Sequence, residues 1–80
     1  MGPRDWADHM RRVGFNWSST GEHWWRVDKP GGDTRLVQKD SDGAWYATAY
    51  HMGTSWGWRS DNFDTPVAAA VYAELNNWGR

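Results

Sequence analysis

The chain has 80 residues, of which 39% are hydrophobic, and its nine Lys and Arg against ten Asp and Glu give a formal net charge of −1. This length predicts one domain, residues 1–80, and the near-neutral charge argues against a dedicated duplex-DNA binder, which usually has a basic excess. The absence of cysteine excludes disulfides and thiol chemistry, and no apolar run approaches the ~18 residues needed to cross a bilayer. We therefore expect a cytoplasmic protein without a membrane segment.

The first predicted element is a helix over residues 3–13. Trp6, Met10 and Val13 recur at i, i+4 and i+7, so they form one apolar stripe that we expect to dock on a sheet. Residues 15–21 follow as a connection, in which the aromatic side chains either extend into a strand or close one end of the core.

The middle of the chain has the alternating pattern of strands. It is found in four segments, residues 22–28, 34–39, 44–51 and 55–60. Pro and Gly between the first two segments, and Asp-Gly between the next two, favour tight hairpins. In the first segment Trp25 and Val27 share the better core face. Leu36 and Val37 are consecutive and point to opposite faces, and the pattern leaves open which one is inward.

The last predicted element is the clearest helix. Thr65 is a natural N-cap residue and Pro66 suits the first helical position. Apolar residues then recur at spacings of three, four and three and predict the buried seam of the helix: Ala68, Val71, Leu75 and Trp78.

Together these elements predict an α+β fold. It comprises an N-terminal helix, an antiparallel meander of three to four strands, because short hairpins pair neighbouring strands antiparallel, and a C-terminal helix packed on one sheet face. The other face is then open to solvent, or shielded in part by the first helix.

The sequence offers little support for catalysis. His9, His23 and His51 lie in separate elements, and the two that could meet across strands, His23 and His51, match no metal-ligand spacing. The serines lack a nucleophile motif, and the glycine-rich spots are hairpin turns, not phosphate loops. We expect no enzymatic activity, no metal site and no cofactor.

Tryptophan usage is the most informative feature. A core of this size absorbs about four or five indoles, and the chain has eight, so some should be partly exposed. Exposed Trp beside Arg marks a protein–protein hot spot or a platform that stacks unpaired bases. The candidate binding residues are Trp24, Arg26, Arg35, Trp56, Trp58 and Arg59. Alternatively, a helix covers each face of the sheet and every ring belongs to the core.

Two stretches of the second half carry a family resemblance. They are GAWYATAY at 43–50, as a strand, and FDTPVAAAVYAEL at 63–75, as a turn and an alanine-rich helix. Here the chain resembles the arm-type, AP2-like N-terminal DNA-binding modules of phage integrases, in which a three-stranded sheet precedes such a turn and helix. In that family the sheet enters the major groove. The resemblance implies that the following residues would lie near DNA: Arg26, Arg35, Lys39 and Arg59.

We predict a non-enzymatic binding module that contacts a protein partner through an aromatic and arginine-rich sheet face or through the N-terminal helix. The alternative is a small AP2-like DNA-binding domain that uses the same sheet face. The chain has no isoleucine and two lysines but many Arg, Ala, Gly and Trp residues, which is the bias of a GC-rich genome. This bias predicts a protein of an actinobacterium or of one of its phages, and we expect the module to be of phage or mobile-element type.

Overall fold

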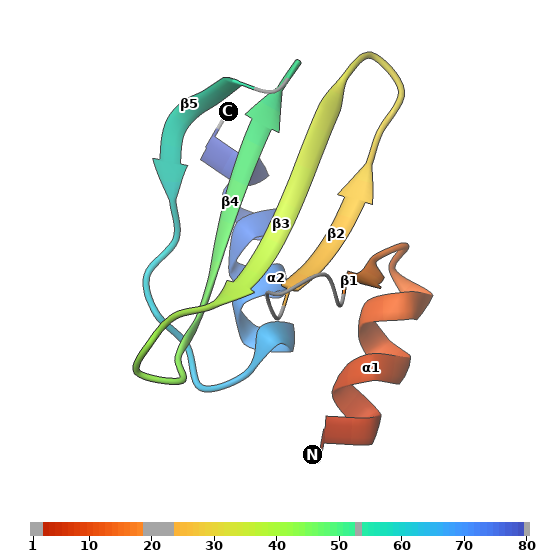
Figure 1. Cartoon of the computed structure of the whole chain (residues 1–80), viewed down its shortest axis with the longest axis vertical. Helices are drawn as coiled ribbons and strands as arrows, with labels where there is room; N and C mark the ends of the chain where they lie inside the picture. Colours follow the sequence, from red (N-terminus) through yellow and green to blue (C-terminus); the bar gives the residue numbers. More distant parts are fainter. Residues whose placement is uncertain (1–2, 19–23, 53, 80) are drawn as a thin grey trace.

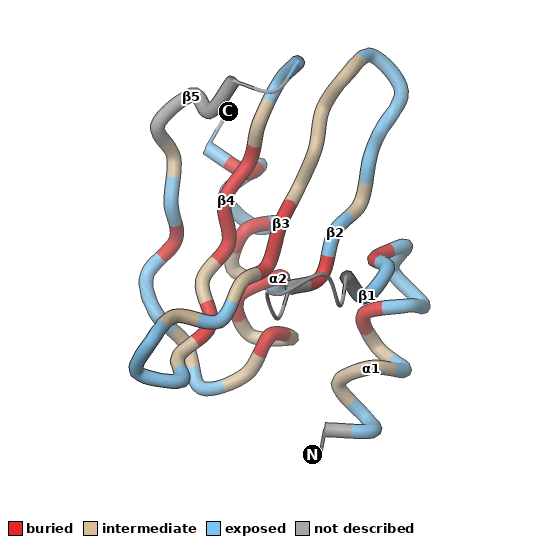
Figure 2. The backbone as a smooth tube through the Cα atoms, in the orientation of Figure 1, coloured by how far each residue is buried: buried red, intermediate tan, exposed pale blue. Residues whose placement is uncertain are grey.

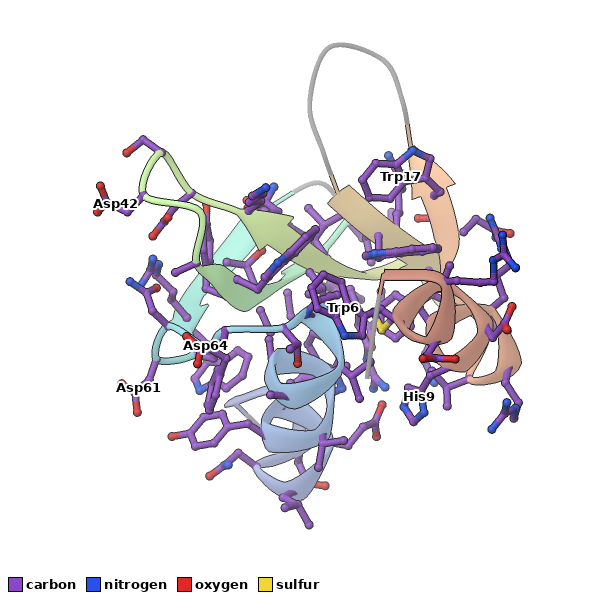
Figure 3. All side chains as sticks on the ribbon, turned by 90° about the horizontal axis from the view of Figure 1, so that it is seen from below. Trp6, His9, Trp17, Asp42, Asp61 and Asp64 are labelled. Atoms are coloured by element: carbon purple, nitrogen blue, oxygen red, sulfur yellow. The ribbon has the colours of Figure 1, made fainter. Side chains whose placement is uncertain are left out.

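The computed structural model describes residues 3–18, 24–52 and 54–79, without the side chains at 3, 18, 24 and 54–57. In chain order the elements are α1 (Pro3–Arg12), β1 (Asn16–Ser18), β2 (Trp24–Asp28), β3 (Asp33–Lys39), β4 (Trp45–His51), β5 (Thr54–Arg59), α2 (Pro66–Leu75) and a 3₁₀ helix (Asn77–Gly79). The strands pair antiparallel in the order β1-β2-β3-β4-β5 (Figure 1). Both helices lie on the same side of the sheet (Figure 3). The α+β fold is therefore confirmed.

The sheet of the described residues has one strand more than the three or four predicted. The extra strand is β1, which lies in the predicted connection and confirms the alternative that its aromatic residues extend into a strand. Trp17 lies opposite Trp25 on β2, and the centres of the two indole rings are 5.0 Å apart. Cross-strand aromatic pairs are among the strongest side-chain contacts of a sheet, so this pair explains how a three-residue edge strand is held.

Both predicted hairpin turns form. In the first, the Lys29 amide donates to the Asp33 carbonyl at 2.7 Å. In the second, the Asp40 carboxylate accepts two backbone N–H groups of its own turn, at 2.9 and 3.0 Å. The second turn sets Lys39 directly opposite Trp45 on the neighbouring strand.

The N-terminus of α2 is as predicted, because the Thr65 hydroxyl accepts the Ala68 amide hydrogen at 3.1 Å. The predicted buried seam is wrong for Val71 and Leu75, whereas its last member, Trp78, is buried, but in the 3₁₀ helix that follows α2. Val71 and Leu75 are 45% and 79% exposed. The helix instead buries its small residues, Pro66, Ala69, Ala70 and Ala73.

Small side chains explain this choice of face. The buried alanines of α2 belong to the same core as Ala47 and Ala49 of β4, so the helix backbone approaches the sheet closely. Branched residues such as Val71 and Leu75 at this position would hold the helix away from the strand. They line an open groove of about 280 Å³ between the two helices instead.

The stripe of α1 is also shorter than predicted. Met10 is fully buried and Trp6 is half-buried, but Val13 is 52% exposed. The helix ends at Arg12, and Gly14 turns the chain with a φ of +100°. Val13 therefore leaves the stripe, and Phe15, which is 3% exposed, enters the core in its place.

Large side chains fill the two ends of the core around the central alanines. Figure 2 shows the buried stretches along the middle of the sheet and on α2. Val37 is the inward residue of its pair, whereas Leu36, 6% exposed, lies on the opposite face. The described core residues are Met10, Phe15, Trp25, Val37, Trp45, Ala47, Ala49, Ala69, Ala70, Ala73 and Trp78.

Trp78 closes the end of the core at the C-terminus of α2. It is 1% exposed, and its ring lies 6.0 Å from that of Phe15 and 6.1 Å from that of Trp58. Its Nε1–H donates to the Glu74 carboxylate at 3.0 Å. The chain reaches this position through residues with positive φ, and a Cβ atom on Gly79 would overlap the Trp58 ring.

We predict that Gly79→Ala destabilises the protein more than Gly31→Ala. Both glycines have positive φ, which costs an L-residue about 1–2 kcal/mol, but position 31 faces open space. At position 79 overpacking against Trp58 adds about 1–3 kcal/mol. Urea unfolding followed by tryptophan fluorescence measures the difference. Equal losses for the two variants would contradict the tight packing described around Trp78.

Candidate functional site

The structure does not gather the predicted binding residues on one surface. Arg26 and Arg59 lie on the sheet face away from the helices, because they are neighbours of core-facing residues in their strands. Arg35 and Trp58 lie on the face that the helices cover. The side chains of the other two are outside the described residues: Trp24 and Trp56.

Arg35 closes the core instead of offering a binding group. It lies opposite Ala49 on β4, and its guanidinium carbon is 5.4 Å from the centre of the Trp78 ring. Its Nη1 is 3.5 Å from Glu74 Oε1. The aliphatic part of the Arg35 side chain covers apolar surface, and its guanidinium group pairs with Glu74 at the edge of the core. Arg35, predicted to be exposed, is therefore only 21% exposed.

Trp58 likewise belongs to the packed side of the sheet. Its ring meets Trp78 edge to face, and it packs as a half-buried residue against the core. The prediction that some indoles are partly exposed is confirmed in the described residues by Trp6, Trp17 and Trp58.

On the uncovered sheet face, the side chain of Arg59 is held in place by neighbouring side chains. The Arg59 guanidinium carbon lies 3.9 Å from the centre of the Tyr46 ring, and Nη2 donates to the Asn62 side chain at 2.9 Å. Stacking and hydrogen bonding hold this cation flat against the sheet. It is therefore presented in a fixed orientation on the face away from both helices.

Arg26, on the same face, is charge-compensated. It donates to Asp28 Oδ1 from Nε and Nη2 at 3.2 and 3.1 Å, and the Thr34 hydroxyl donates to the same oxygen at 2.8 Å. The Thr34 bond, followed by the Arg26 bond, holds the pKa of Asp28 below its ordinary value of 3.8. Asp28 therefore stays ionised into acid solution and offsets the Arg26 charge.

The two described histidines lie apart, His51 beside Asp33 in the sheet and His9 on α1. His51 Nδ1 lies 2.7 Å from Asp33 Oδ1 across the β3–β4 pair. The possible partner of His51, His23, is outside the described residues. Within the described ranges no three His, Asp or Glu side chains are placed to hold a metal ion.

The structure gathers a different set of tryptophans around a pocket of about 390 Å³. The pocket is open to solvent and lies between α1, the sheet and the start of α2. Six elements contribute to its wall: Trp6, Ala7 and Arg11 of α1, Trp17 of β1, Trp25 of β2, Lys39 of β3, Trp45 of β4 and Pro66 of α2. Figure 3 shows Trp6 in the space between α1, α2 and the sheet, with Trp17 above the neighbouring edge.

Two cations border the indoles of this pocket. The Arg11 guanidinium carbon is 5.7 Å from the centre of the Trp25 ring, and Lys39 Nζ is 6.0 Å from that of Trp45. Both distances are in the range of cation–π attraction. The lining residues include no acidic side chain.

The sequence does not predict this pocket, for a physical reason. The alternation of strands correctly set Trp25 inward, and the helical stripe correctly included Trp6. Trp17, however, stood in a predicted connection. Its meeting with the other indoles depends on the β1–β2 pairing and on the place where α1 docks, and neither leaves a local signal in the sequence.

Comparison of the chain with protein-family models, curated proteins and solved structures finds no match. Among the described residues, neither helix has the length and apolar character that crossing a bilayer requires.

We predict that Thr34→Val raises the pKa of Asp28 toward 3.8, because the strongest hydrogen bond to its carboxylate is lost. A carboxyl group whose pKa is lowered in the folded state stabilises the fold above pH 3.8, and this stabilisation disappears as the pH falls through the lowered pKa. Thr34→Val therefore loses this small stabilisation. NMR titration of the Asp28 carboxyl carbon measures the change. The control is Thr48→Val, because the buried Thr48 hydroxyl has no partner among the described residues. An unchanged Asp28 titration in Thr34→Val would contradict the assignment.

Proposed function

We propose that the protein is a non-enzymatic binding module that acts through protein–protein contact, and that its docking site is the tryptophan-lined pocket beside α1. One observation carries this proposal. Four indoles from four different elements, Trp6, Trp17, Trp25 and Trp45, converge on one open pocket. A concave apolar site with a few polar groups is the usual form of a binding site, and Trp is enriched in protein–protein hot spots.

The openness of the pocket supports a macromolecular partner over a small molecule. Sites for small molecules bury most of the ligand surface, whereas this pocket opens directly to solvent. Such a shape suits one large side chain that is inserted from the surface of a partner. Trp17, which is 40% exposed, adds an accessible aromatic surface at the rim.

The setting that we propose for this module follows from composition. The bias against isoleucine and lysine supports a phage or mobile-element protein from an actinobacterial host, and the absence of cysteine supports the cytoplasm.

A selection of displayed random peptides against the protein tests the docking site. We expect enriched peptides whose binding weakens at least about ten-fold in Trp17→Ala, because one wall of the pocket is lost. Tyr46→Ala is the matched control, since it removes an aromatic ring from the other sheet face. The variant loosens β1, which the Trp17–Trp25 pair holds, but Trp17 is outside the buried core, so the rest of the fold should persist, which circular dichroism checks.

Two results would count against the proposal. One is a selection without enriched peptides. The other is a set of peptides that bind Trp17→Ala as tightly as the unchanged protein but lose affinity for Tyr46→Ala.

A second candidate function is DNA binding by the uncovered sheet face, as the AP2-like resemblance implies. The observation that favours it is the fixed orientation of Arg59 on Tyr46, with Arg26 on the same face. The charge balance favours it less, because Asp28 pairs with Arg26. Arg35 and Lys39 would not contribute, since both are on the helix side of the sheet.

Fluorescence anisotropy with labelled duplex DNA at low salt tests this candidate. Sheet-face binding predicts that Arg26→Gln and Arg59→Gln each weaken binding and reduce the slope of log affinity against log salt by about one. Arg12→Gln, on the exposed surface of α1, is the control. Absence of binding at low salt, or equal affinity of all variants, would remove this candidate.

A further inference from the structure

We infer that the tryptophan-lined pocket takes a peptide segment of the partner that carries a large apolar side chain next to a carboxylate. This inference rests on the proposed docking function and specifies the chemistry of the partner. The apolar part follows from the indole walls. The carboxylate follows from the two cations at the pocket, Arg11 and Lys39.

These cations differ from two of the three described arginines of the sheet, which pair with carboxylates, and share with Arg59 a position beside an aromatic ring. Arg26 pairs with Asp28 and Arg35 with Glu74. Within the described part of the chain, neither Arg11 nor Lys39 forms an ion pair; each lies beside an indole of the pocket. The site therefore has two uncompensated positive charges above apolar walls, and an acidic partner is electrostatically complementary to it.

Trp6 supplies an independent polar feature of the same pocket. Its indole Nε1 is buried and has no hydrogen-bond partner among the described residues. A buried donor without an acceptor is costly, so an acceptor that reaches it is favoured. Because Trp6 lines the pocket, an inserted segment that moves this ring can offer its carboxylate or carbonyl oxygen to the N–H group.

The charge pattern favours a short acidic peptide over a nucleic acid. Single-stranded nucleic acids need a track of positive charge along several phosphates as well as rings on which bases stack. Two cations line this pocket, and α1 exposes Asp5 and Asp8 on its surface. These carboxylates would repel a long polyanion, whereas one or two carboxylates beside an anchor side chain match the available charges.

The test uses the ¹⁵N-labelled full chain and the blocked tripeptide acetyl-Glu-Phe-Glu-amide. Its neutral analogue acetyl-Gln-Phe-Gln-amide, the ring-free acetyl-Glu-Ala-Glu-amide and oligothymidylate are the comparison ligands. Titration is followed on the indole N–H signals, to which eight tryptophans contribute. Pocket variants are Arg11→Gln and Lys39→Gln, and their matched controls are Arg12→Gln and Lys29→Gln, which change exposed cations outside the pocket.

The expected result is that acetyl-Glu-Phe-Glu-amide shifts the signals of the pocket tryptophans. It should bind about five-fold or more tightly than the neutral analogue at low salt and more tightly than the ring-free peptide. Each pocket variant should remove up to about five-fold of this preference, the usual range of an exposed ion pair, and the matched controls none.

Two results overturn the inference and differ in what they mean for the function. If acidic and neutral phenylalanine peptides bind the pocket equally, the carboxylate preference is wrong and the docking function stands. If no peptide moves the pocket signals, or only oligothymidylate does, both the inference and the proposed docking function are wrong.

Discussion

The close approach of α2 to β4 through alanine is the contact on which the rest of the structure depends. Ala69, Ala70 and Ala73 of the helix share one buried core with Ala47 and Ala49 of the strand. With so little side-chain volume at the centre, the large rings can pack only at the two ends of the helix. The tryptophan side chains that the structure describes thus fall into two groups, one near the C-terminus of α2 and one near its start.

The two groups differ in how far their rings are covered. At the C-terminal end, Trp78 folds back under the sheet, bonds Glu74 and is covered by Arg35, so the rings there are closed off and the charges are paired. At the start of α2 the indoles instead line an open pocket. The same residue type therefore stabilises the fold at one end and offers a binding surface at the other.

This division also separates the cations by role. Arg26 and Arg35 form ion pairs with carboxylates of the same chain, so their charges are compensated within the fold. Arg59 is held flat on the uncovered face by Tyr46, and Arg11 and Lys39 remain beside indoles at the pocket. Charge that is paired within the fold contributes little to attracting a partner, so the pocket offers two cations without a described ion pair beside an apolar surface.

The sequence by itself determined the features that depend on neighbouring residues: the α+β class, both hairpin turns, the Thr65 cap and the inward direction of Trp25. Tertiary structure alone decided which face of α2 is buried, because an apolar period does not show that alanine fits a close approach better than Val71 or Leu75. It also decided the binding surface. The sequence predicted Arg26 and Arg35 on one sheet face, and only the register of β2 against β3 sets them on opposite faces. The docking of both helices on one side then decides which face is covered.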